Sequence, residues 1–265
     1  MKIGFSFLSL KTYSVRRAID ITQNLGGNTL ELFGDLVLFF NGRLLEKPER
    51  IREYARKIKN FFLTMHLPYI DINLGSFNDL IWKSSIDSVL KALDYAYKIG
   101  VKRAVIHPGQ VPLRIFLLKY LAKKRLKKSL EIIMDKADKY GIEITFENTY
   151  FDDNDLFENV EEFKKFIDTF RERLKVCFDF GHANISSQGV NKSFEILRPY
   201  ITHIHIHDND GTKDEHLSLG KGKIQFEEYL DFIRNFKGSI ILEINSLKEK
   251  HENLKRSIQY LKGER

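Results

Sequence analysis

Eight short runs of β-branched and aromatic residues alternate with helical patterns along the whole chain. A strict alternation of strands and helices predicts a parallel sheet, and eight such units close into a barrel. We expect strands at Lys2–Phe7, Thr29–Phe33, Phe61–His66, Arg103–His107, Glu143–Glu147, Lys175–Asp179, His203–His207 and Ile240–Glu243. The length of 265 residues suits such a barrel. With no linker or second composition regime, the prediction is a single (β/α)8 TIM barrel over residues 1–265.

The segments between these strands have the 3.6-residue periodicity of helices that pack on a sheet. The apolar positions of two of them are Val15, Ala18, Ile19 and Thr22, and Ile86, Val89, Leu90, Leu93, Ala96 and Tyr97. Gly100 and Gly141 follow two helices as stop signals, and Pro48 suits a helix start. Each expected strand therefore has a helix after it.

The net charge of +7 and the isoelectric point near 9.2 favour polyanionic or phosphorylated partners. Charged residues make up 30% of the chain, and Lys, Glu and Ile are abundant while Gln is scarce. The same composition fits the ion-pair networks on the surface of a thermophilic protein. Both interpretations of the charge stay open.

The chain has no apolar run of about 18 residues, so we expect no membrane span. The opening residues Met-Lys-Ile-Gly-Phe-Ser-Phe are typical of a first strand and lack the features of a signal peptide. The lone Cys177 has no partner for an internal disulfide, which favours a reducing compartment. We therefore expect a cytoplasmic protein.

Residues of the types that bind divalent metals recur at or just beyond the expected strand ends. They are His66, His107, Glu147, Asp179, His182, His205, Asp214, His216 and Glu243. Imidazole and carboxylate groups are ligands of zinc and manganese. Because the carboxyl ends of barrel strands meet at one face, these residues predict one shared metal site in an enzyme.

Three of these residues end expected strands. His66 and His107 are each followed closely by a proline, which ends strand pairing and turns the chain outward at the barrel rim. Glu147 closes an apolar strand, where a carboxylate is costly without a cation or a hydrogen-bond partner. We interpret it as a ligand that bridges two metals, with an Arg partner as the alternative.

Asp179 and His182 lie in Cys-Phe-Asp-Phe-Gly-His-Ala, where Gly181 would allow a sharp turn that returns the histidine over the barrel mouth. Asp214 and His216 lie in a polar, glycine-bearing loop that either is simply solvated or completes a further metal site with His182.

His203, His205 and His207 alternate, so they point to one face of their strand at different depths. We expect His205 to be the metal ligand and His203 a hydrogen-bonded core residue. His207 would contact substrate or bond to Asp208.

The run Lys119–Lys128 is strongly basic, and its apolar residues keep helical spacing. We expect an exposed helix of the outer ring, with contact to nucleic acid as the second interpretation.

Together these motifs resemble the endonuclease IV group (AP endonuclease family 2) within the xylose isomerase-like barrel superfamily. The resemblance runs from His66 to Glu243 through His-Leu-Pro-Tyr, His-Pro-Gly, Glu-Asn-Thr, Asp-Phe-Gly-His-Ala, Asp-Glu-His-Leu-Ser-Leu-Gly-Lys-Gly and Leu-Glu-Ile. It implies hydrolysis of DNA 5′ to abasic sites by a metal-activated hydroxide. It also places Tyr69 beside the site, where we expect it to bind substrate.

The resemblance implies up to three ions, zinc first and manganese as an alternative. One would be bound by His66, His107 and Glu147, a second by Glu147, Asp179, His205 and Glu243, and a third by His182, Asp214 and His216. Paired metals can stabilise the attacking and leaving oxygens of an in-line displacement. Glu147, Asp179 and Glu243 are the expected catalytic residues.

One segment departs from this family. The family carries an Arg- and Gln-rich loop after its second strand, but here Leu-Phe-Gly-Asp-Leu-Val-Leu-Phe-Phe-Asn follows, with no Arg or Lys before Arg43. Leu38, Phe39 and Phe40 are apolar candidates to insert between bases, or to pack on the barrel.

The same superfamily contains sugar isomerases and epimerases, and the loop from Asp208 to Gly220 is as similar to members placed with them. In that alternative one ion is held by Glu147, Asp179, His205 and Glu243. Glu147 and Glu243 would then move a proton between adjacent carbons of a small phosphorylated sugar. A third hypothesis is a barrel that binds metal or ligand without turnover.

Overall fold

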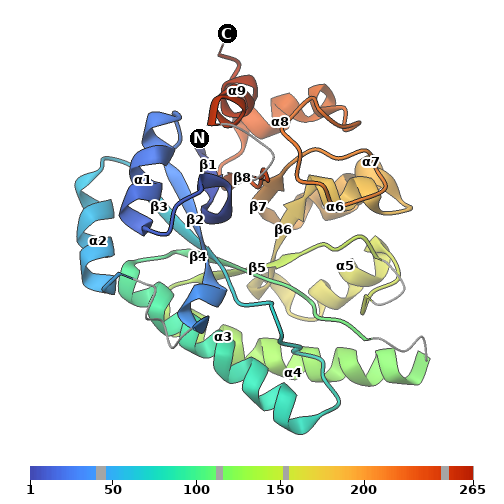
Figure 1. Cartoon of the computed structure of the whole chain (residues 1–265). Helices are drawn as coiled ribbons and strands as arrows, with labels where there is room; N and C mark the ends of the chain where they lie inside the picture. Colours follow the sequence, from blue (N-terminus) through green and yellow to red (C-terminus); the bar gives the residue numbers. More distant parts are fainter. Residues whose placement is uncertain (40–45, 112–115, 152–154, 246–250, 265) are drawn as a thin grey trace.

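Eight parallel strands form a closed barrel in the order β1 to β8, and helices surround it (Figure 1). The protein is seen here in a computed structural model that describes residues 1–39, 46–111, 116–151, 155–245 and 251–264. The strands are β1 (Lys2–Ser6), β2 (Thr29–Phe33), β3 (Phe62–His66), β4 (Arg103–Ile106), β5 (Glu143–Glu147), β6 (Lys175–Asp179), β7 (Ile201–Ile206) and β8 (Ser239–Leu242). The pairing of β8 with β1 closes the barrel, so the predicted fold class is confirmed.

Some strand ends differ from the prediction by one or two residues, and three of the differences at the mouth involve candidate site residues. β4 ends before His107, β7 before His207 and β8 before Glu243. Pro108 directly follows His107, and a proline has no backbone N–H to donate to a neighbouring strand. These side chains consequently lie on the rim of the barrel.

The helices follow the expected alternation. They are α1 (Val15–Asn24), α2 (Pro48–Lys57), α3 (Asp79–Ile99), α4 (Phe116–Tyr140), α5 (Val160–Asp168), α6 (Phe180–Ile185), α7 (Gly189–Leu197), α8 (Leu230–Asn235) and α9 (His251–Lys262). The apolar positions predicted for α1 are buried. Gly100 ends α3 in the left-handed conformation, with φ of 92°, as the stop signal predicts.

Short 3-10 helices complete the connections. They are η1 (Phe7–Leu10), η2 (Gly34–Val37), η4 (Arg171–Arg173), η5 (Arg198–Tyr200) and η6 (Phe226–Tyr229). η1 and η2 directly follow β1 and β2, so they lie at the same end of the barrel as the expected site. No helix within the described residues is both long and apolar enough to span a membrane.

The basic run belongs to α4, on the outside of the barrel (Figure 1). Its charged groups have local partners: Lys123 pairs with Glu162, Lys127 lies 5.7 Å from the ring centroid of Phe170, and Lys128 lies 5.4 Å from that of Trp82. The apolar side of α4 is buried at Leu126, Leu130, Ile133 and Met134. This arrangement agrees with the expected outer-ring helix.

Candidate metal centre

The first group of candidate ligands joins β3, β4 and β5. His66 Nε2, His107 Nε2 and Glu147 Oε2 form a triangle with sides of 3.1, 3.3 and 2.9 Å. Glu147 Oε2 is buried and has no aligned hydrogen-bond donor. Three ligand atoms so close to one another are the arrangement expected around one metal ion.

Tyr69 covers this first group. Its ring stacks on His107 with centroids 5.0 Å apart, and it meets the His66 ring edge-on at 4.7 Å. Asp35 accepts backbone hydrogen bonds from Tyr69 and Ile70, at 3.3 and 3.1 Å, and so fixes the loop that carries the tyrosine. The family resemblance implied that Tyr69 lies beside the site, and the structure brings it there. Asp35 was not predicted.

The second group lies deeper in the barrel. His205 Nδ1 is 3.0 Å from Glu147 Oε1, 3.8 Å from Glu243 Oε2 and 3.9 Å from Asp179 Oδ2. Asp179 Oδ2 is buried and has no hydrogen-bond donor. The two oxygens of Glu147 therefore face two different groups, which is the geometry a bridging carboxylate needs. No Arg side chain pairs with it among the described residues.

The third group joins the segment after β6 to the loop after β7. Asp214 Oδ2 lies 3.4 Å from His182 Nε2 and 3.2 Å from His216 Nε2. Asp208 anchors the loop that carries Asp214 and His216, because its carboxylate accepts the backbone N–H groups of Gly220, Gly222 and Ile224. The structure therefore brings all nine predicted residues together.

Three outer histidines share one feature. His66 Nδ1, His182 Nδ1 and His216 Nδ1 lie 2.9, 2.9 and 2.6 Å from the carbonyl oxygens of Leu67, Asn148 and Glu243. A carbonyl can only accept, so each Nδ1 carries a proton, and each ring can present the lone pair of Nε2 to an ion once Nε2 has lost its own proton. Histidines that ligate metals almost always donate their other N–H in this way.

His207 is fully buried, yet neither ring nitrogen has an aligned hydrogen-bond partner. Its Nε2 lies 3.3 Å from Asp179 Oδ1 and 3.4 Å from Asp214 Oδ1. The ring stacks on His216 with centroids 4.0 Å apart. The suggested bond to Asp208 is wrong, because that carboxylate is occupied by the backbone of its own loop.

The prediction of a sharp turn at Gly181 is also wrong. Helix α6 begins at Phe180, directly after β6, and the Asp179 side chain caps it by accepting the N–H of His182 at 2.6 Å. The helix itself carries His182 over the mouth. The glycine is needed for a different reason, because a Cβ there would lie 1.9 Å from the His207 ring.

The electrostatics of the site keep Glu147 and Asp179 ionised, because each has a pKa below its ordinary value. Burial alone would raise the pKa of Glu147, but the charges of His205 and His107 lower it well below its ordinary value. For Asp179, burial is likewise outweighed by the charges of His182 and His207, which lower the pKa. Metal ligands must be deprotonated, so these acids are in the form that binds a cation.

Sequence reasoning missed Glu31 in the middle of β2. Its side chain is buried between His203 and His205, and His203 is the hydrogen-bonded core residue that we expected. The argument that identified Glu147, a carboxylate within an apolar strand, applies equally to Thr-Leu-Glu-Leu-Phe.

Comparisons with known proteins agree with this architecture. A probable endonuclease 4 of Aquifex aeolicus is 26% identical to this chain, with 71% of each protein covered. An uncharacterized protein of Methanocaldococcus jannaschii is 35% identical over 69% of this chain and 70% of its own length. The solved structure of a D-tagatose 3-epimerase-like protein is 25% identical, covers 99% of both chains and has a TM-score of 0.81. Residues 19–264 match the family model described as the xylose isomerase-like TIM barrel, and the chain belongs to that family.

Proposed function

We propose that the protein is a metal-dependent phosphodiester hydrolase that cleaves DNA 5′ to abasic sites. Its residues fit three divalent ions, with zinc the first choice and manganese the alternative, because imidazole and carboxylate ligands accept both. Ions held by these residues would supply an activated water molecule and would stabilise charge on a phosphodiester under in-line attack. The relatives named probable endonuclease 4 support this choice of reaction.

The observation that carries the proposal is the orientation of the outer histidines. The Nδ1 atoms of His66, His182 and His216 donate to backbone carbonyls, so their Nε2 atoms face carboxylate oxygens from two separate sides of the mouth. A one-metal sugar enzyme needs only the deeper residues, whereas this chain positions the outer ones equally well. The complete outer set therefore favours several ions.

Within this proposal Glu147 links two metal positions, and Asp179 and Glu243 complete the deeper one with His205. We further propose that His207 is a ligand rather than a substrate contact. A fully buried imidazole without partners is costly, and its Nε2 lies between oxygens of Asp179 and Asp214. A cation at that point would satisfy all three groups.

Substrate binding would rely on aromatic rings at the mouth. Phe39 is 37% exposed and meets Phe33 edge-on at 6.2 Å, and Phe33 meets Tyr69 at 6.0 Å. Such rings can stack on bases without sequence preference. Leu38 is half-buried, and Phe40 and Arg43 lie outside the described residues.

A sugar isomerase or epimerase is the second candidate function. The observation in its favour is the likeness to the D-tagatose 3-epimerase-like protein along 99% of both chains. Glu147 and Glu243 would then transfer the proton, since both carboxylates reach the deeper group, and the sugar would carry a phosphate.

Zinc content and cleavage of a duplex with one abasic site test the proposal on the same sample. We expect about three ions per chain and cleavage 5′ to the abasic site. His182→Ala should lower the cleavage rate by about 100-fold, because it removes a ligand and its partner contacts. His251→Ala, an exposed histidine at the start of α9, is the matched control and should change nothing.

Two results would decide against hydrolysis. One ion per chain, with solvent hydrogen exchange at the carbon beside a ketose carbonyl and no DNA cleavage, indicates the isomerase. Bound metal with neither activity indicates a binding protein.

A further inference from the structure

A buried carboxylate lies beneath the proposed metal centre. Glu31 of β2 accepts three hydrogen bonds: from Thr64 Oγ1 at 2.9 Å, His203 Nε2 at 2.9 Å and His205 Nε2 at 2.8 Å. Its side chain is 1% exposed and both histidines are fully buried. Because one carboxylate serves residues from β3 and β7, the position of Glu31 is fixed from opposite sides of the barrel.

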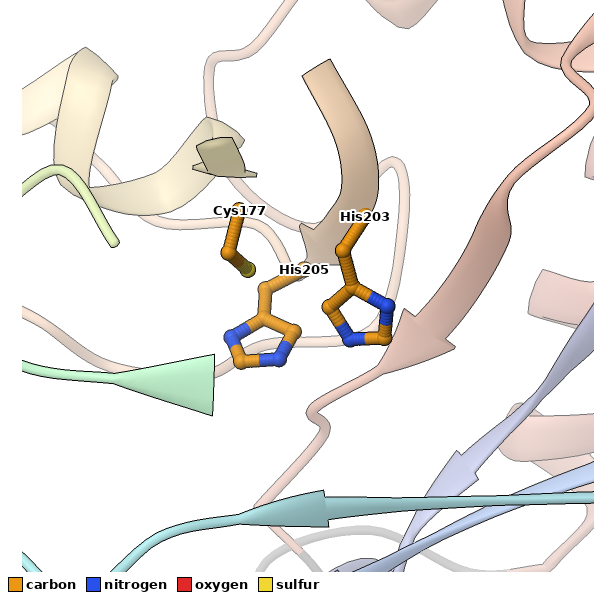
Figure 2. Close-up of side chains that lie close together, drawn as sticks. All are labelled: Cys177, His203 and His205. Carbon is orange, nitrogen blue, oxygen red and sulfur yellow. The ribbon is translucent and has the colours of Figure 1, made fainter. Parts of the chain in front are cut away.

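The same region offers an alternative interpretation as a separate metal site. Figure 2 shows Cys177 beside His205, with His203 adjacent on the same strand, and their ligand atoms lie within 4.8 Å of one another. However, His203 already bonds Ser239 through Nδ1 at 2.7 Å and Glu31 through Nε2. Cys177 is fully buried beside His205, whose two ring nitrogens already face Glu31 and Glu147 rather than the thiol.

The bonds of His205 lead toward the mouth instead. Its Nε2 faces Glu31, so its Nδ1 points at Glu147 Oε1, 3.0 Å away, and toward Glu243 and Asp179. A carboxylate that holds the far nitrogen of an imidazole fixes the tautomer and the ring orientation of a metal ligand. Glu31 occupies that place in this chain.

We infer that Glu31 is a positioning residue: it holds His205 so that Nδ1 faces the ion shared with Glu147. The inference rests on the metal-binding part of the proposed function and is independent of the reaction catalysed. Glu31 touches neither the outer residues His182, Asp214 and His216 nor any substrate position described above. Its loss should therefore affect the positions next to Glu147 and spare the third.

Glu31→Gln is the direct test, because it keeps the size of the side chain but cannot accept from both imidazoles and Thr64. Zinc affinities are measured by chelator competition on the full chain, and the third position is identified as the one that His182→Ala removes. We expect the Glu147-linked positions to weaken by about 10- to 100-fold, while the third keeps its affinity. Glu46→Gln, which removes a carboxylate bound to Ser14 and Arg16 on the outside, should leave all affinities unchanged.

Thr64→Val provides a milder variant if Glu31→Gln does not fold. It removes one donor to Glu31 without changing side-chain shape, and it should weaken the same positions by a few-fold.

Unchanged affinities, or an equal loss at every position, overturn the inference, since an equal loss indicates a purely structural role. Loss of a fourth ion upon Glu31→Gln overturns it in favour of a separate site at Cys177. A wild-type chain that binds no zinc overturns both this inference and the proposed function.

Discussion

The ring of His207 lies against the backbone of Gly181, so closely that a Cβ at position 181 would be 1.9 Å from the ring carbon Cε1. Gly181→Ala should therefore displace His207 or the start of α6, and destabilise the fold by about 1–3 kcal/mol. Metal affinity should fall with it, because His182 follows directly on the same helix. Chemical denaturation and zinc titration measure the two effects.

The double variant Gly181→Ala/His207→Ala separates the clash from the loss of a ligand. Removal of the ring makes room for the methyl group, so stability should recover while metal affinity stays low. Recovery of both would mean that His207 binds no metal.

Glu147→Gln should remove two ions at once. Its oxygens face His107 Nε2 at 2.9 Å and His205 Nδ1 at 3.0 Å, and an amide replaces one of those oxygens with a donor. His216→Ala should remove only one ion, because it belongs to the third group alone. Metal content after dialysis gives the counts, and an equal loss in both variants would contradict the bridging role.

The stability of the protein should depend on pH in opposite directions with and without metal. Burial would lower the pKa of His216, but its bond to Asp214 and the charges of Glu243, Asp214 and Asp179 raise it to about 9. When a chelator has removed the metal, the stabilisation from charged His216 is fully present below about pH 6.5, the ordinary pKa of histidine. It is lost as the pH rises through 9. With zinc, rising pH removes the competing proton, so stability should increase.

Thermal unfolding from pH 6.5 to 9 checks both signs. His216→Asn should reduce the change of Tm with pH both with and without zinc. Part of that change should remain, because the pKa of other site histidines is also raised. A metal-free protein whose Tm rises over this range would contradict the assignment.

Two variants of Tyr69 separate the stacking of its ring on His107 from the contact of its hydroxyl group with substrate. Tyr69→Phe keeps the stacking on His107, so zinc affinity should be unchanged, and any rise in KM reports contact of the hydroxyl with substrate. Tyr69→Ala removes the stacked ring, which is worth about 0.5–1.5 kcal/mol, and should weaken the first ion by up to about 10-fold. Equal zinc affinities in both variants would show that the ring does not support His107.

The basic helix should be dispensable for activity. Lys127 and Lys128 lie over the rings of Phe170 and Trp82 on the outside of the barrel. Lys127→Gln and Lys128→Gln should leave the KM for DNA unchanged, with stability lower by about 0.5–1 kcal/mol per lost contact. A KM that rises several-fold would instead make α4 a nucleic-acid contact.

The barrel and the placement of the candidate ligands at its mouth could be predicted from the sequence, because both depend on local order. Strand and helix periodicity follows from side-chain spacing, and a histidine followed by a proline marks a rim position. His66 and His107 were found in this way. Such signals need no knowledge of the opposite wall of the barrel.

The contacts of Glu31, Gly181 and His207 could not be predicted from the sequence. Glu31 meets His203 and His205 across separations of 172 and 174 residues, and only closure of the barrel brings them together. The alternation of His203, His205 and His207 predicts that they share one face of the strand. It does not predict which of them have hydrogen-bond partners. Gly181 resembled a turn residue, although its function is to leave space for a ring from another strand.

The anchoring of Asp208 has a consequence for how this loop can change. Its carboxylate ties residues 220–224 to the end of β7, so the span that bears Asp214 and His216 is closed at its base. Thr212 and Lys213 project from that closed span into solvent. Residues at the tip of this span can therefore be exchanged or inserted to suit a different substrate, while Asp214 and His216 keep their positions.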